Sequence, residues 1–169
     1  MIRGFGKFVL TPFLLLAPAT ALAAYDVNGV ELGAREAAVQ KAFPSARCKP
    51  LEWESRAADR RCDDSRAVFG GVSVRVTFYL RKDAVQAFDL RLATGDVERF
   101  AEFLKSRYGV PVSETRDDIE RKGKSARRTY KAVWERDGTR AVLTALFEKR
   151  TASLLVSRGN FEEEIYRVR

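Results

Sequence analysis

Carboxylates are the main residues of this chain that could do acid–base chemistry, because none of its 169 residues is a histidine. Histidine is the commonest general base and a common metal ligand, so its absence excludes Ser-His-Asp, Cys-His and histidine-metal mechanisms. A carboxylate pair or a Ser/Lys dyad is what remains. Adjacent acids occur at Asp63-Asp64, Asp117-Asp118 and residues 162–164. Neighbours on a strand point to opposite faces, so we expect these acids to be solvated turn or cap residues.

A basic segment stands directly before a predicted strand that carries aromatic residues. Its five cations occur within eight positions without an intervening acid: Arg121, Lys122, Lys124, Arg127 and Arg128. The strand that follows presents Tyr130 and Trp134 on the same face as Arg128. Positive charge interleaved with aromatic rings could bind an anionic polymer or a carbohydrate-bearing partner. The alternative is a solvated loop before an ordinary strand with both rings in the core, and charge runs usually mark exposed loops.

Trp53 is a further candidate contact, because it stands between Glu52 and Glu54 on another predicted strand. If the ring faces outward, it could contact a partner, since exposed aromatic residues are enriched at interface hot spots. The alternative is a tryptophan that covers the sheet edge or the core, which is the more usual role. The candidate binding surface therefore combines Trp53 with the basic segment and its two aromatic residues.

The first 23 residues have the three parts of an export signal. Arg3 and Lys7 form a positive start, residues 8–19 are mostly apolar, and a small-x-small motif ends at Ala23. We predict cleavage between Ala23 and Ala24, which places the protein in the periplasm or the extracellular space. A membrane anchor is the alternative, but the apolar run is shorter than the roughly 20 residues that span a bilayer.

Cys48 and Cys62 are the only cysteines of the chain. Export places them in an oxidising compartment, where a disulfide persists, so we expect them to be bridged. The closed loop of about 15 residues corresponds to roughly 3 kcal/mol of stabilisation on chain-entropy arguments. A redox or metal site is the alternative, but the chain has neither a CxxC motif nor a histidine.

From Ala24 onward the chain has 146 residues, the size of one domain with a sufficient core. Arg3 and Lys7 are the only charged residues before it, so 29 of the 31 basic residues stand against 23 acidic ones, a formal charge of +6. This charge favours anionic partners. No later apolar run is long enough to span a membrane. An exported chain is not expected to meet nucleic acid, and no cofactor is expected.

Apolar and polar residues alternate most regularly at residues 72–80, which indicates a half-buried strand. A strand returns through Phe88, Leu90 and Leu92, and Asp137-Gly138 is a strong two-residue hairpin turn. Further strands are predicted at residues 48–54, 60–64, 127–136, 140–147 and 152–157. Helices are predicted at residues 35–42, at residues 97–108 after a cap at Asp96, and from Asn160 in the tail.

These elements predict an α+β fold, with an antiparallel sheet in one layer and helices packed on it in the other. A helix followed by about four strands occurs twice in the predicted order. This order suggests a tandem duplication with halves at residues 24–94 and 95–169, within one domain from 24 to 169. The two halves share little residue identity, so the suggestion depends on element order alone.

The segment from Gly29 to Gly33, followed by a short helix with Val39 and ended by Phe43-Pro44, resembles the start of many small exported proteins. These proteins pack a helix-first unit on an antiparallel sheet, as in the outer-membrane assembly lipoprotein BamE/SmpA family and the β-lactamase inhibitory proteins, which are tandem copies of such a unit. The resemblance implies a binding module more readily than an enzyme. The chain lacks the lipidated cysteine of the lipoproteins, so no membrane tether is implied.

We therefore expect a non-enzymatic exported protein that binds an envelope protein or an anionic envelope component through its sheet face or its basic segment. One alternative is a carboxylate-based hydrolase or lyase that acts on envelope polysaccharide or peptidoglycan. Another is an inhibitor of a secreted enzyme. If the chain is a binding protein, we expect an exposed aromatic patch on the sheet and no deep cleft. If it is an enzyme, we expect two or more carboxylates with raised pKa values to converge in a pocket.

Overall fold

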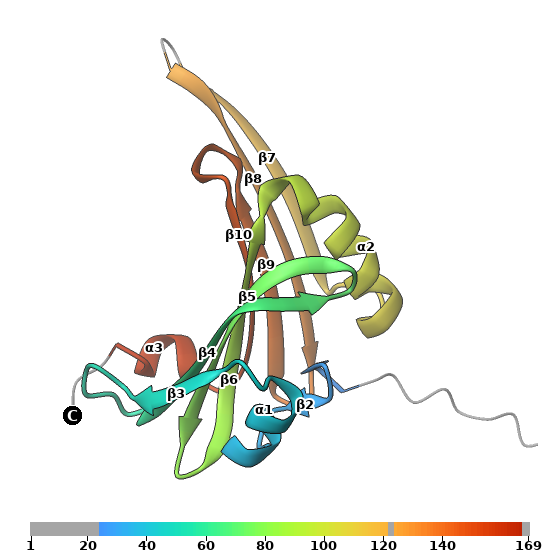
Figure 1. Ribbon diagram of the computed structural model, residues 1–169. Helices are drawn as coiled ribbons and strands as arrows, with labels where there is room; N and C mark the ends of the chain where they lie inside the picture. The colour runs from blue at the N-terminus through green and yellow to red at the C-terminus, as the bar shows by residue number, and fades with distance from the viewer. Residues whose placement is uncertain (1–23, 122–123, 167–169) are drawn as a thin grey trace, which may run out of the picture.

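The computed structural model describes residues 24–121 and 124–166 of the protein. The predicted export signal, residues 1–23, lies outside these ranges, so its cleavage before Ala24 stays a prediction. An antiparallel sheet of eight strands dominates the described part of the chain, and a separate pair of short strands lies beside it (Figure 1). None of the helices in these ranges has the length and hydropathy that a membrane span requires.

The large sheet has the strand order β3-β4-β5-β6-β10-β9-β8-β7. Every neighbouring pair in it is antiparallel. Its strands are β3 (Arg47–Pro50), β4 (Arg60–Phe69), β5 (Val72–Arg81), β6 (Ala84–Ala93), β7 (Ser113–Arg121), β8 (Lys124–Arg136), β9 (Thr139–Leu146) and β10 (Thr151–Arg158). The small sheet pairs β1 (Asp26–Val27) with β2 (Val30–Glu31).

The predicted two-layer α+β fold is wrong, because the structure is mostly antiparallel β. The helices are α1 (Glu36–Ala42), α2 (Val97–Tyr108) and α3 (Phe161–Glu164), with single 3-10 turns η1 (Thr94–Asp96) and η2 (Phe147–Lys149). In the described ranges only α2 is longer than seven residues. Helices this short cannot form a layer that matches an eight-stranded sheet. β4 and β8 are longer than predicted, and one strand of the large sheet was missed. β3 is shorter than the predicted strand at residues 48–54, so Trp53 lies after its end.

The missed strand is β7, which forms one edge of the sheet. All of its described side chains, from Ser113 to Ile119, are exposed, so it has no apolar alternation that could reveal it. Charged residues on an edge strand discourage pairing with other chains. β7 and β8 form a long hairpin that projects beyond the rest of the sheet (Figure 1).

The core lies on the sheet face that α1 and α2 cover. On β5 every second side chain is buried there, from Val72 to Leu80, as the period-two pattern predicted. α2 contributes a stripe at spacings of three and four, with Phe100 and Leu104 fully buried at its centre. This one face therefore provides most of the hydrophobic stabilisation.

β4 extends past Asp64, where the sequence predicted its end, and a β-bulge lies between Asp64 and Ala67. Asp64 is buried and accepts hydrogen bonds from the Ser45 hydroxyl at 2.6 Å and from the backbone N–H of Arg66 at 2.8 Å. These bonds satisfy a carboxylate that would be costly to bury alone. Beyond the bulge, the β4–β5 hairpin bends toward α2 (Figure 1), and Phe69 packs there.

Cys48 and Cys62 form a disulfide between β3 and β4, where they are directly opposed in register. Cys62 is fully buried in the main core and Cys48 packs against it. The cysteine pair expected from the sequence is therefore present. It fixes the short edge strand β3 to the body of the sheet.

Substitution of the two glycines at the β4–β5 turn tests this packing. Both Gly70 and Gly71 have positive φ, so alanine at either costs about 1–2 kcal/mol. A Cβ at Gly70 would also overlap the ring of Phe103, whereas a Cβ at Gly71 would meet nothing. We expect Gly70→Ala to lower the free energy of unfolding by about 1–3 kcal/mol more than Gly71→Ala, measured by chemical denaturation. Equal losses would show that the ring does not pack on this turn.

Candidate functional site

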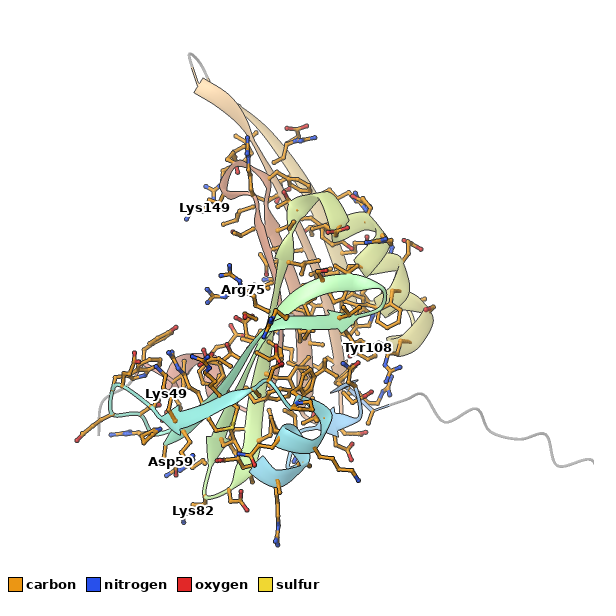
Figure 2. All side chains as sticks on the ribbon, in the orientation of Figure 1. Lys49, Asp59, Arg75, Lys82, Tyr108 and Lys149 are labelled. Atoms are coloured by element: carbon orange, nitrogen blue, oxygen red, sulfur yellow. A yellow bond between two sulfur atoms is a disulfide. The ribbon has the colours of Figure 1, made fainter. Side chains whose placement is uncertain are left out.

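Within residues 24–121 and 124–166, α3 is the one helix on the sheet face opposite α1 and α2, and it covers only one end of that face. We call this face the open face. It is formed by outward side chains of β5, β6, β10, β9 and β8. In Figure 2 the labelled Arg75 points away from α2, and Lys149 lies on the same side as Arg75. α3 and the β9–β10 connection flank the open face at its two ends (Figure 1).

Strand register places a row of polar side chains across the open face, in the order Arg75, Arg91, Ser153, Thr144 and Lys131. Each residue is directly opposite the next on the neighbouring strand. Arg75 and Arg91 are therefore opposed like charges, which destabilise a sheet. The side chain of Arg91 is 69% exposed, and Arg75 and Lys131 are also exposed. This row gives the middle of the open face a positive character.

The adjacent row is more apolar. It runs through Thr77, Asp89, Leu155, Val142 and Val133. Leu155 and Val142 are half-buried, and Leu155 packs against the cluster of Phe161 and Ile165 at α3. A polar row beside an apolar row is the mixture of contacts that protein interfaces use.

α3 is held at one end of the open face by apolar contacts and two hydrogen bonds. Phe161 and Ile165 are buried in a small cluster against the sheet, separate from the main core. The Trp53 indole N–H donates to the carbonyl of Ile165 at 2.9 Å, and the Ser55 hydroxyl donates to the carbonyl of Glu164 at 3.1 Å. The segment that precedes β4 therefore anchors the C-terminal helix.

A hollow of about 280 Å³ lies between α3 and the strands. Asp89 and Glu162 are its two acids, and Asp89 is only 13% exposed. The Arg91 Nε–H donates to Asp89 Oδ2 at 3.0 Å. The remaining lining residues are Tyr79, Ser153, Leu155, Phe161, Ile165 and Tyr166. We call this space the α3 hollow.

Burial raises the pKa of the Asp89 carboxyl above its usual value of 3.8, and the hydrogen bond from Arg91 offsets only part of that effect. The same hydrogen bond raises the pKa of Arg91. The pKa of the Tyr79 hydroxyl is also raised, first by burial and then by the charge of Asp89. The ion pair is therefore attractive, but the attraction is smaller than the cost of burying the carboxylate.

A second hollow of about 440 Å³ lies beside the start of β10. It is lined by the guanidinium-bearing residues Arg75, Arg91 and Arg150 and by Ser65, Ser73, Val74, Leu92, Ala93 and Thr151. None of these lining residues is acidic. Arg91 lines both hollows, so the two adjoin on the open face. We call this second space the arginine hollow.

The two predicted aromatic contacts of β8 are not on the surface. Tyr130 and Trp134 are each 1% exposed, because their face of β8 is the one that α2 covers. The Trp134 indole N–H donates to the carbonyl of Gly109 at 2.8 Å, and the Tyr130 hydroxyl donates to Glu114 at 2.9 Å. The prediction that these two rings belong to a binding surface is therefore wrong, and both rings pack in the core as the alternative expected.

The other predicted contacts have mixed outcomes. Trp53 is half-buried and stacks on the ring of Tyr166, with centroids 6.0 Å apart, so it is mainly an anchor for the C-terminal segment. Arg127 and Arg128 are exposed, and the Arg128 guanidinium lies 5.0 Å from the centroid of the Phe147 ring. Lys122 lies outside the described residues, as do the side chains of two others: Arg121 and Lys124.

Sequence reasoning missed the two hollows, although the outward positions of Arg75, Asp89 and Arg91 were visible in the strand alternation. What it lacked was the pairing of β6 with β10, which brings Ser153 and Leu155 beside them. That pairing joins strands far apart in the sequence, and no local pattern encodes it.

Within the described ranges, one group of three side chains is close enough to share a metal ion, namely Glu36 with Cys48 and Cys62. The two sulfur atoms are bonded to each other, and a cysteine binds metal as a thiolate. This group therefore does not support a metal site.

Comparison with protein-family models, with curated proteins and with solved structures finds no match to this chain. Function is therefore inferred from the structure and the sequence of the chain.

The buried carboxylate of Asp89 should give a measurable pH dependence. Because its pKa is raised in the folded protein, the unfolded chain loses this proton first as the pH rises through 3.8. The contribution of Asp89 to stability therefore falls with rising pH until the folded carboxyl has ionised. In Asp89→Asn this contribution is absent, so the wild type should lose stability relative to the variant over that interval, measured by denaturation at a series of pH values. A difference that grows in favour of the wild type would contradict the burial.

Proposed function

We propose that the chain is an exported, non-enzymatic protein that binds an anionic component of the cell envelope through its open face. The observation that carries the proposal is the pair of adjoining hollows on the open face. One hollow is partly apolar and aromatic, and the other is lined by three arginines. A partner that contacts both would meet an apolar surface beside positive charge.

Two cations of the open face have no acidic partner. Arg107 and Arg116, which lie on the helix side, are instead paired with Asp26 and Glu98. On the open face, the side chains of Arg75 and Lys131 form no ion pair or hydrogen bond with other described residues. Unpaired cations around a low-dielectric surface attract anions. The net charge of +6 from Ala24 onward acts in the same direction.

Aromatic rings stand at one end of the open face, as a binding surface would require. Tyr166 is 75% exposed and lines the α3 hollow. Tyr79 lines the same hollow, with its ring centroid 5.4 Å from that of Phe161. Rigid aromatic rings beside arginine are the residues most enriched at interface hot spots.

An enzymatic role is less well supported by the same geometry. Asp89 and Glu162 both line the α3 hollow, as a carboxylate-based hydrolase would need. Asp89, however, is largely buried and accepts a hydrogen bond from Arg91, so it is held as an ion-pair partner. A general acid must instead reach the proton acceptor of the substrate.

Export is part of the proposal, supported by the disulfide, which is typical of oxidising compartments, and by the predicted signal at residues 1–23. The mature protein, isolated from the cell, should begin at Ala24 and be lighter than its reduced form by two hydrogen atoms. Intact-mass spectrometry before and after reduction measures both. A chain that keeps residues 1–23, or that carries two free thiols, would contradict export.

A matched pair of lysine substitutions tests the binding face. Lys131 on the open face and Lys41 on α1 are both exposed, and neither side chain has a partner among the described residues. We expect Lys131→Glu to reduce the capture of anionic envelope material by the immobilised protein about tenfold, because it puts a negative charge in the binding face. Lys41→Glu makes the same change of charge on the helix side and should leave capture unchanged.

Capture is measured from an envelope extract at low and at physiological salt, since screening should weaken it. The melting temperature of each variant shows that it is folded. Equal capture by the two variants would place the binding face elsewhere, and no captured anionic material with the wild type would contradict the function itself.

A further inference from the structure

We infer that the arginine hollow binds a phosphate group in its dianionic form, either as free phosphate or as a phosphate monoester on a larger molecule. The inference rests on the proposed function and names the group that the open face recognises. It depends on three arginines from three different segments, which line one hollow of about 440 Å³.

The first observation is the opposed pair of like charges. Arg75 on β5 and Arg91 on β6 are directly opposite each other in register and both line the hollow. Opposed like charges on a sheet are destabilising without a counter-charge. Within the described residues, Arg75 has no side-chain partner and Arg91 shares only its Nε–H with Asp89. The other N–H donors of both guanidinium groups remain for an anion.

The second observation concerns Arg150, which enters the hollow from the turn between η2 and β10. Its backbone has φ 51°, in the left-handed region that non-glycine residues rarely adopt. Such a conformation persists only when its surroundings hold it, and it recurs at ligand clamps. The Arg150 side chain also has no partner among the described residues. The chain therefore keeps an arginine at a position where glycine would be less strained.

The third observation is the charge and the donor set of the hollow. Asp89, which lines the adjoining α3 hollow, neutralises the charge of one of the three arginines. The arginine hollow therefore keeps an excess of two positive charges. A phosphate monoester carries about −1.5 to −2 charges near neutral pH, with several strong acceptor oxygens. The lining also provides the hydroxyl groups of Ser65, Ser73 and Thr151, which can donate to such oxygens. Arginine suits this ligand because its planar fork binds two oxygens at once.

The test is titration of the folded protein with inorganic phosphate, with glucose 1-phosphate and with dimethyl phosphate, followed by NMR at constant ionic strength set with chloride. We expect inorganic phosphate to shift the amide signals of the hollow and to saturate. Binding of glucose 1-phosphate as well would identify a monoester presented on a larger molecule, whereas binding of inorganic phosphate alone would identify the free ion. Dimethyl phosphate carries a single charge and should bind at least tenfold more weakly.

Three variants assign the binding to the hollow. Arg75→Gln and Arg91→Gln should each weaken phosphate binding roughly tenfold or more, because each removes charged donors. Arg150→Gly should do the same while relieving the left-handed backbone, and an unchanged melting temperature shows that the loss of binding does not come from unfolding. The control is Lys149→Gln, an exposed cation next to Arg150 that does not line the hollow and should bind as the wild type does.

Two outcomes would overturn the inference. One is the absence of saturable binding by inorganic phosphate, and the other is an equal loss of affinity in Lys149→Gln and Arg150→Gly, which would indicate diffuse attraction by net charge. Neither outcome decides the proposed function, because capture of anionic envelope material is tested at Lys131, outside this hollow. If Lys131→Glu captures normally while phosphate still binds, the proposed binding face fails and the phosphate site stands.

Discussion

Burial of one sheet face against α2 determines which side chains of each strand reach the open face. A strand side chain that points toward α2 forces its neighbours to point the other way. Val74, Val76 and Leu90 are buried in the core, so Arg75 and Arg91 must stand on the open face. A register slip of one residue would reverse this and bury the two arginines, which makes the register strongly specified. The positions of the polar row are thus a direct result of hydrophobic burial on the opposite side.

The two ends of the open face are built differently. At one end, α3 is too short to be stable alone, and it is held by Phe161 and by the hydrogen bond from Trp53. At the other end, the turn after η2 brings Arg150 to the start of β10. The sheet itself supplies Arg91, which lines both hollows and connects the two ends. The open face therefore combines rigid strand positions with two segments that the sheet holds in place.

The sequence predicted the local features whose causes are local. The strand at residues 72–80, the helix at 97–108 and the Asp137-Gly138 turn are where the period and turn chemistry placed them, and both turn residues have positive φ. The fold class was wrong because the described helices are too short to form a second layer, and because β7, which has no apolar alternation, was missed. Tyr130 and Trp134 were wrongly included among the candidate contacts for a related reason. Both rings stand near positive charge in the sequence, which suggested a ligand site. The alternation of side chains along β8 instead turns them toward the core.

The functional account depends on the open face meeting a partner in the cell envelope. Its most direct test is a photoreactive amino acid placed at Thr144, in the polar row, or at Ser106, an exposed position on α2, in cells that export the protein. We expect a covalent adduct with an anionic envelope component after illumination from position 144 and none from position 106. Adducts from position 106 alone, or equal adducts from both positions, would contradict it.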